Sequence, residues 1–304
     1  MQVSVARVPL YAAGLAVIVA AAVAGCSPSS SSSAGASGSA GAGASGSASP
    51  APANALEAVK LAAQTASGAN SYSGTMSLQG TVNPGAASSS GVSGGISMSG
   101  TFAEQLHPKL LISADIGSYS MLGTSLPGGL SELITPTTIY LKSAQLTQEL
   151  HLTKPWLALP LAAASKSSGI NLSQLVNQAT GTSPLTQAQM LGASSSVREV
   201  GTGSIGGVPV TEYAGTISVA KAISTLSGGA KAEMEQMNAA AGLTTEKYTV
   251  WIDGQHIMRK AIITGTGTTL TETVTVTFTS VNQPVKVTVP PASQTTTVPS
   301  SDLG

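Results

Sequence analysis

Cys26 is the residue of this 304-residue chain whose type and position are most informative about chemistry. It is the only cysteine, and it follows Val23-Ala24-Gly25 at the end of an apolar stretch. A long tract of Ser, Gly and Ala comes directly after it. A single thiol has no internal partner for a disulfide, and no catalytic base accompanies it in the sequence. We interpret Cys26 as a point where lipid is attached through the sulfur.

The segment in front of Cys26 has the parts of an export signal. Arg7 supplies a short basic start, and the stretch from Leu10 to Val23 is apolar or small throughout. That stretch is shorter than the roughly 20 apolar residues that span a bilayer, and it is typical of a signal peptide, here residues 1–25. A plain secretory signal with an accidental cysteine is the alternative.

The run from Val23 to Cys26 resembles the lipobox of bacterial lipoproteins. The resemblance implies cleavage between Gly25 and Cys26 and a diacylglyceryl group on the sulfur, with acyl chains such as palmitate. Two or more acyl chains hold a protein firmly to a bilayer. We therefore expect a chain anchored by lipid to the extracytoplasmic face of the cell membrane, with Cys26 as its contact with the membrane.

Two motif matches indicate enzymes, but each has a simpler interpretation. The run from Gly201 to Gly206 matches a dinucleotide fingerprint, which requires a helix directly after it. Residues 208–213 have the pattern of a strand instead, so we predict a hairpin turn. The run from Gly91 to Gly95 matches a nucleophile elbow, yet it lies in a low-complexity loop and no specific Asp and His follow it.

A third match and the histidines give no firmer indication of catalysis. Ser218 and Lys221 have the spacing of penicillin-interacting enzymes, but the companion motifs of those enzymes are absent from the sequence. We interpret Ser218 as a helix cap. The histidines lie at positions without metal-ligand spacing: His107, His151 and His256. We predict no enzymatic activity, no metal and no cofactor.

The composition narrows the possible partners. The chain has 13 basic and 13 acidic residues, charged residues are 9% of it, and aromatic residues are 3%. Without a basic stripe or aromatic platforms, nucleic-acid binding is not expected. We expect a monomer.

Low-complexity segments flank the part that we expect to fold. Residues 26–53 comprise Cys26 and a tract of Ser, Gly, Ala and Pro, which predicts a disordered tether with a mean reach of about 30 Å. Residues 54–290 remain for one folded domain. A tail rich in Thr, Ser and Pro, residues 291–304, is expected to be disordered.

The folded part is predicted to alternate between strands and a few helices. A helix is expected over 54–68, capped by Asn54, and short helices are expected at 172–176, from 184 to 191, at 218–226 and at 230–240. Strands are expected at 72–80, 94–104, 110–116, 137–142, 196–205, 208–217, 246–253, 256–265 and 269–281.

The last strand shows the alternation most clearly. From Thr271 to Thr279, threonines alternate with Val274, Val276 and Phe278. One buried face and one hydroxyl-bearing face are typical of an antiparallel sheet that is solvated on one side. We predict an α+β fold: one large curved antiparallel sheet, a half-barrel, with helices packed on its concave face.

The final third of the folded part resembles a known family. Residues 248–253 (YTVWID) and 254–260 (GQHIMRK) are similar to a strand–turn–strand element of the actinobacterial LppX/LprAFG-type lipoproteins. Further matches are Asn282 to Val287, Lys154 to Trp156, the segment from Val200 to Ile217, and Ser71 to Gly74. Together these matches cover most of residues 54–290. The resemblance implies a fold like that of the LolA/LolB periplasmic lipoprotein carriers, with about eleven strands and an apolar cavity for acylated lipids or glycolipids.

The apolar strand residues have two interpretations. They either line such a cavity or fill a solid core, which is the commoner role of an apolar strand face. The residues concerned are Met76, Met98, Val250, Ile252, Val274, Val276 and Phe278.

Two functions follow from these alternatives. The first is lipid binding, which would help to carry lipids to the cell surface. The alternative is a non-enzymatic extracytoplasmic interaction or sensory module of the same fold with a filled core.

Overall fold

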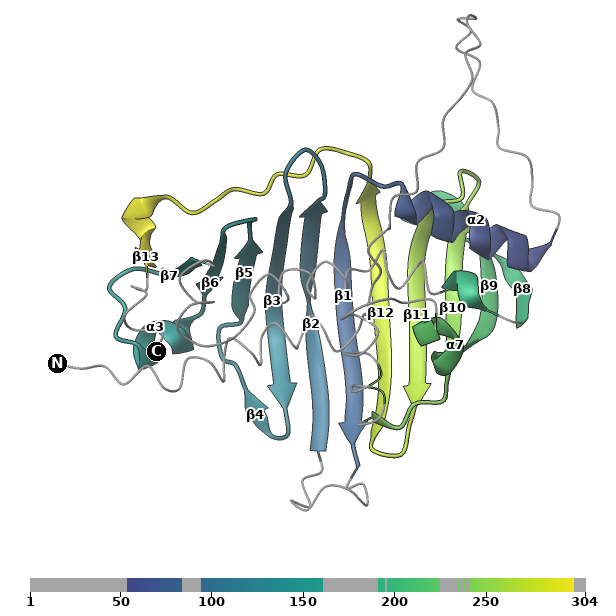
Figure 1. Ribbon diagram of the computed structural model, residues 1–304, viewed down its shortest axis with the longest axis horizontal. Helices are drawn as coiled ribbons and strands as arrows, with labels where there is room; N and C mark the ends of the chain where they lie inside the picture. Colours follow the sequence, from purple (N-terminus) through teal and green to yellow (C-terminus); the bar gives the residue numbers. More distant parts are fainter. Residues whose placement is uncertain are drawn as a thin grey trace, which may run out of the picture.

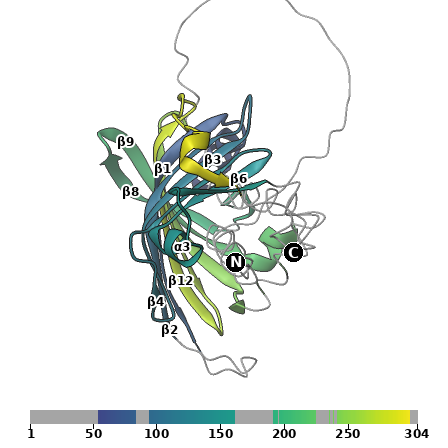
Figure 2. The same cartoon turned by 90° about the vertical axis from the view of Figure 1, so that its left-hand side faces the viewer.

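One large sheet dominates the computed structural model (Figure 1), which describes residues 54–83, 94–160, 191–194, 196–224, 235, 238 and 241–297. The sheet has 13 strands in the order β13-β7-β6-β5-β3-β2-β1-β12-β11-β10-β9-β8, and β4 pairs with β3 beside this path. Figure 2 shows the sheet nearly edge-on, as a curved layer. The predicted α+β half-barrel is confirmed, with thirteen strands where about eleven were expected.

The first half of the described chain forms one wing of the sheet. It begins with α2 (Ala55–Ser67), whose cap Asn54 accepts a hydrogen bond from the Glu57 backbone N–H at 2.9 Å. The strands of this wing follow in chain order: β1 (Ser71–Val82), β2 (Gly94–Gln105), β3 (Leu111–Met121), β4 (Thr124–Ser125), β5 (Leu130–Ile134), β6 (Thr138–Lys142) and β7 (Trp156–Pro160). The short helix α3 (Ala144–Glu149) joins β6 to β7.

The second half forms the other wing and returns to the first strand. Its elements are the 3₁₀ turn η2 (Leu191–Ala193), β8 (Ser196–Ile205), β9 (Val208–Ser218), α7 (Val219–Ser224), β10 (Thr245–Asp253), β11 (Met258–Thr266) and β12 (Leu270–Val281). β12 pairs antiparallel with β1, with Met76 opposite Val276 and Leu78 opposite Val274. This pairing joins the two wings, so neither wing forms the sheet alone.

The alternation predicted for the last strand extends across the sheet and defines its two faces. On β12, Val274, Val276 and Phe278 are buried while the threonines between them are partly exposed. On β1, Tyr72, Met76 and Leu78 are buried and face the same side as their β12 partners. We call this buried side the inner face. The other side carries rows of Ser and Thr, such as Thr75, Ser77 and Thr275.

Helical residues pack on the inner face. Ala58, Val59 and Ala62 of α2 belong to the same buried cluster as the strand residues, and so do Leu146 of α3 and Leu191 of η2. α2 contacts β8 and β10, and in Figure 1 it crosses that wing of the sheet near the upper strand ends. Small alanines on the packed side of α2 allow the helix to approach the strands closely. Within the described residues, no helix is both long enough and apolar enough to cross a membrane.

The predictions for the connecting segments have mixed outcomes. The strands β5, β7 and β13 and the helix α3 were not predicted, and β3 extends to Met121, beyond the predicted end at residue 116. The helix expected at 172–176 and most of that expected at 184–191 lie outside the described residues. So do the Ser/Gly loop at 84–93 and most of the helix expected at 230–240.

The prediction of a disordered tail from residue 291 is wrong for residues 291–297. Ala292–Gln294 form a 3₁₀ turn (η3), and Thr295–Thr297 form β13, which pairs parallel with β7. Figure 1 shows the segment after β12 crossing the upper end of the sheet to reach the far edge. Lys154 explains part of this order, because its Nζ donates to the carbonyl oxygens of Ala292 at 2.9 Å and Thr295 at 3.0 Å.

Replacing Lys154 is expected to loosen this C-terminal strand. In Lys154→Ala the two carbonyls lose a charged donor, a loss of about 1–2 kcal/mol of local stability. Hydrogen exchange should become faster at Thr295–Thr297 and on β7, and stay unchanged on β1 and β12. Lys109→Ala, which removes an exposed lysine elsewhere, is the control. Unchanged exchange at Thr295–Thr297 in Lys154→Ala would show that Lys154 does not hold the segment.

The hairpin between β10 and β11 is organised by one buried carboxylate, Asp253. Its Oδ1 accepts the backbone N–H groups of Gln255 and Ile257, both at 2.9 Å. Its Oδ2 accepts Arg259 Nε at 2.7 Å, and the second guanidinium nitrogen lies 2.7 Å away. Asp253 and Arg259 therefore hold the turn that contains His256, whose φ is 60°.

Asp253→Ala is expected to destabilise the protein by about 2–3 kcal/mol, because it leaves two backbone donors and a partly buried guanidinium unpaired. The midpoint of urea unfolding measures this loss. Asp115→Ala is the matched control, because Asp115 lies exposed on β3. Equal midpoints for the two variants would contradict the role of Asp253.

Candidate functional site

Three aromatic rings meet on the inner face where β2, β1 and β12 lie side by side. Tyr72 lies 5.9 Å from Phe102 and 6.1 Å from Phe278 between ring centroids, and the two phenylalanines are 6.0 Å apart. All three contacts are edge-to-face, the arrangement that aromatic quadrupoles favour. The chain has only two phenylalanines, and both are here.

A glycine makes the aromatic cluster possible. Gly74 is the partner of Phe102 on β2 and of Phe278 on β12. A Cβ built at this position would lie 2.9 Å from Phe102 Cζ, closer than packed carbon atoms approach. The missing side chain therefore leaves room for the phenylalanine rings to meet over the central strand.

An apolar pocket opens beside this cluster. It is lined by Thr65 and Ala66 from the end of α2, by Ile257 and Met258 from the β10–β11 hairpin, and by Tyr72, Phe278 and Val281 from the sheet. Its volume is about 290 Å³, including space open to solvent. Because that figure counts space open to solvent, the enclosed part is small and admits only a small apolar group.

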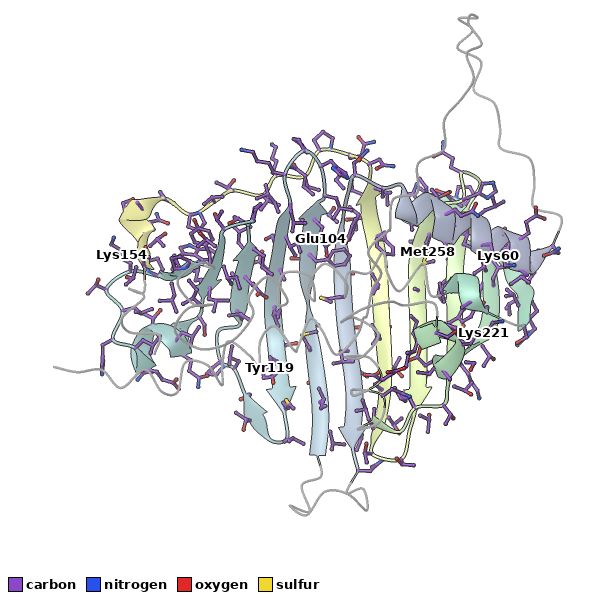
Figure 3. The ribbon with its side chains drawn as sticks, viewed as in Figure 1. Lys60, Glu104, Tyr119, Lys154, Lys221 and Met258 are labelled. Carbon is purple, nitrogen blue, oxygen red and sulfur yellow. The ribbon has the colours of Figure 1, made fainter. Side chains whose placement is uncertain are left out.

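A buried carboxyl group is hydrogen-bonded to one of the pocket residues. Glu104 of β2 is 3% exposed, and the Tyr72 hydroxyl donates a hydrogen bond to its Oε2. Burial raises the pKa of Glu104 to about 8, although the hydrogen bond from Tyr72 opposes the shift. Figure 3 shows Glu104 at the same end of the sheet as Met258, with β1 and β12 between their strands.

Further carboxyl groups lie on the inner face, away from the pocket. Burial raises the pKa of Glu132 to about 7. Burial also raises the pKa of Glu272 to about 7, with an added contribution from the charge of Glu246, whose own pKa is raised by burial. Glu272 and Glu246 occupy one row across the sheet, both paired with Gly265 of β11.

The structure places all seven predicted lining residues on the inner face, in one buried cluster: Met76, Met98, Val250, Ile252, Val274, Val276 and Phe278. Only Phe278 among them lines the pocket described above. Whether the other six contact a ligand stays a prediction. Gly25 and Cys26 lie outside the described residues.

Sequence reasoning did not select Tyr72, Phe102 or Glu104 for this site. The signal was present, because Tyr72 has the same alternation as Met76, and Phe102 the same as Met98. Glu104 continues that alternation, so it is an acidic residue on an apolar face. Such a residue is unusual enough to indicate a special role.

The enzyme-like motifs have structural roles where the structure describes them. The run from Gly201 to Gly206 ends β8 and enters a two-residue turn in which Gly206 and Gly207 have φ values of 57° and 82°. This is the predicted hairpin, since such turns need positive φ at both positions. Ser218 precedes α7, and its Oγ accepts the Lys221 backbone N–H at 3.4 Å. The Gly91–Gly95 motif lies mostly outside the described residues.

Metal binding has no support among the described residues, where no group of three His, Cys, Asp or Glu side chains could hold an ion. His256, which lies at the predicted hairpin turn, has a buried Nε2 without a hydrogen-bond partner in the described part.

Comparison with known proteins gives a fold and no family. No family model matches the chain. An uncharacterised 31.2 kDa protein of Streptomyces griseus, encoded between rplA and rplJ, is 28% identical over 110 residues. The match covers 35% of this chain, and this chain spans only about a third of that relative's length (36%).

Several solved structures are similar to this chain at low sequence identity. The lipoprotein LppX of Mycobacterium tuberculosis is 18% identical with a TM-score of 0.41, and the match covers 77% of this chain and 97% of LppX. LprF of Mycobacterium bovis is 13% identical with a TM-score of 0.46, over 78% of this chain and 96% of LprF. A LolA superfamily protein of Nitrosomonas europaea is 8% identical with a TM-score of 0.24, over 77% and 95%. The likeness is one of general fold.

Proposed function

We propose that this chain is an extracytoplasmic lipoprotein that binds an acylated lipid or glycolipid on the inner face of its half-barrel and helps to carry it to the cell surface. The observation that supports this most directly is the apolar pocket beside Tyr72 and Phe278. It lies between a helix end and a hairpin turn, so it can be reached from the end of the sheet.

The binding energy would come from the hydrophobic effect. Each methylene group that leaves water for such a pocket contributes about 0.8 kcal/mol. The enclosed part of the pocket is small, so it would admit only the end of one acyl chain. A longer chain would extend along the inner face by displacing side chains that now fill it, and the unbranched side chains of Met76, Met98 and Met258 adapt readily to such changes.

The proposed action is non-covalent and involves no catalysis. The described motif residues that match enzymes form a hairpin turn and a helix cap, and no cofactor is invoked. The chain is proposed to act as a monomer.

The proposed attachment to the membrane depends on Cys26, which the Ser/Gly/Ala tract up to residue 53 follows in the sequence. In Cys26→Ala the acyl anchor cannot form, so the protein should leave the membrane fraction for the soluble fraction. Ser27→Ala is the matched control, because it alters a neighbouring small residue and keeps the thiol. A Cys26→Ala protein that stays with the membrane would contradict lipidation at this residue.

Filling the pocket tests the proposed binding site. Val281→Trp adds a large ring to the pocket wall, whereas Val289→Trp places the same ring at an exposed position of the C-terminal segment. Val281→Trp should lower the affinity for a fluorescent acyl probe by at least about tenfold, with thermal unfolding used to confirm that it folds. Val289→Trp should bind as the native chain does. Equal affinities for the two variants would place lipid elsewhere or nowhere.

A further inference from the structure

The buried charges of the described residues are all acidic. The buried charged side chains are Glu104, Glu132, Asp253 and Glu272, and no lysine or arginine of the described part is buried. Asp253 alone among the four has an ion-pair partner in the described part, Arg259. The three glutamates of the inner face therefore have no described cation to balance a negative charge.

Burial determines whether these glutamates are protonated or ionised. An ionised carboxylate removed from water without a cation costs several kcal/mol, so the group retains its proton instead. The raised pKa values of Glu104, Glu132 and Glu272 express this cost. At neutral pH and below, Glu104 is a neutral acid, hydrogen-bonded to a phenol.

The pocket residue Tyr72 is therefore joined to an uncharged acid. The Tyr72 ring lines the pocket, and its hydroxyl donates a hydrogen bond to Glu104. The pair has two O–H groups and uses one between its members, which leaves one donor for a carbonyl, ether or hydroxyl oxygen of a ligand. Neither Tyr72 nor Glu104 can neutralise a phosphate or a carboxylate.

We propose that Tyr72 and Glu104 determine which lipids bind, by accepting uncharged acylated lipids and rejecting anionic ones. This inference rests on the proposed function. The polar oxygens of an uncharged lipid, such as ester carbonyls and hydroxyls, receive hydrogen bonds here at no charge cost. An anionic headgroup at the same place would meet no buried lysine or arginine among the described residues.

Acidic side chains also lie at the far end of the inner face. Glu272 lies between two glycines, Gly80 on β1 and Gly265 on β11, and Glu246 lies beyond Gly265 in the same row. Leu243 packs over Gly265, since a Cβ built there would lie 2.9 Å from Leu243 Cδ2. An anion moved along the inner face would thus meet acids at both ends and, in the described part, no buried lysine or arginine.

The test compares two lipids that differ only in a phosphate. Residues 27–304 are mixed with a fluorescent acyl probe, which is then displaced by dioleoylglycerol or by dioleoyl phosphatidic acid at pH 6.5. Dioleoylglycerol should displace the probe at concentrations at least about tenfold lower. In Tyr72→Phe and Glu104→Met, which each remove an O–H and nearly preserve shape, the affinity for dioleoylglycerol should fall severalfold. In Glu149→Gln, an exposed control on α3, it should not change.

The outcomes distinguish a failure of this inference from a failure of the proposed lipid binding. If both lipids displace the probe equally, or phosphatidic acid does so better, the charge selection is wrong while lipid binding stands. If the preference exists but is unaffected by Tyr72→Phe and Glu104→Met, the assignment to these two residues is wrong. If neither lipid nor the probe binds, the proposed function fails and this inference with it.

Discussion

The free energy of unfolding is expected to fall as the pH rises from 5 to 8, the reverse of an ordinary protein with ion-paired carboxylates. Glu104 has a folded-state pKa of about 8 against a usual value of 4.5. Between these values the folded chain holds a proton that the unfolded chain has released, so stability is highest below pH 4.5 and is lost as the pH approaches 8. A pKa difference of one corresponds to about 1.4 kcal/mol, so Glu104 alone contributes a loss on the order of 4 kcal/mol.

Glu132 and Glu272 add to this dependence below pH 7, since burial raises the pKa of both to about 7. Because a domain is typically stable by about 5–15 kcal/mol, the combined loss should be large enough to move the urea midpoint visibly. Urea unfolding at pH 5, 6, 7 and 8 measures it.

Glu104→Gln isolates the contribution of one carboxyl. The amide has the same shape, accepts the Tyr72 hydroxyl and does not titrate, so the variant should lose a large part of the pH dependence and be more stable than the native chain at pH 8. Glu149→Gln, at an exposed site, should retain the native dependence. A native chain whose stability rises from pH 5 to 8 would contradict the assignment of neutral buried acids.

Phe278→Ala is expected to lower the free energy of unfolding by about 3–5 kcal/mol. Phe278 is 4% exposed and contacts both other rings of the aromatic cluster. Truncation removes a whole ring from the strand that joins the two wings, and β-strand neighbours cannot collapse into the space without breaking register. The urea midpoint at pH 6 measures the loss.

Thr275→Ala is the matched control for Phe278→Ala. It lies three residues earlier on β12, on the partly exposed face, and should cost less than about 1 kcal/mol. Phe278→Leu should fall between the two, because leucine refills part of the space. If Phe278→Ala were as stable as Thr275→Ala, the aromatic cluster would not be the centre of the core.

The sequence predicts the long antiparallel strands well, because two-residue alternation is a local property. β12 can be identified from Val274, Val276 and Phe278 alone. Short segments were missed for physical reasons. β7 (WLALP) is a nearly continuous apolar run, and β5 (LSELI) has Ser131 and Glu132 side by side between apolar residues, so neither shows alternation. β13 is three threonines whose order depends on Lys154 and the edge of β7.

The site is only half predictable from sequence. The apolar lining follows from alternation, so all seven predicted residues lie on the inner face. The pairing of Tyr72 with Glu104 depends on the register of β1 with β2, 32 positions apart in the chain, which no local pattern contains. The role of Gly74 cannot be predicted from sequence either, because it depends on the residues that pair with it on the two neighbouring strands.

The most direct test of lipid binding is to look for lipid in the protein as it is isolated from cells. Residues 27–304 contain the whole described sheet and lack Cys26, the proposed acylation site, so any lipid extracted from the purified chain was held non-covalently. We predict that solvent extraction followed by mass spectrometry finds stoichiometric, uncharged acylated lipid in the native chain, and much less in Val281→Trp. A native chain that yields no lipid and takes up no acyl probe would contradict the account and leave a filled-core interaction module in its place.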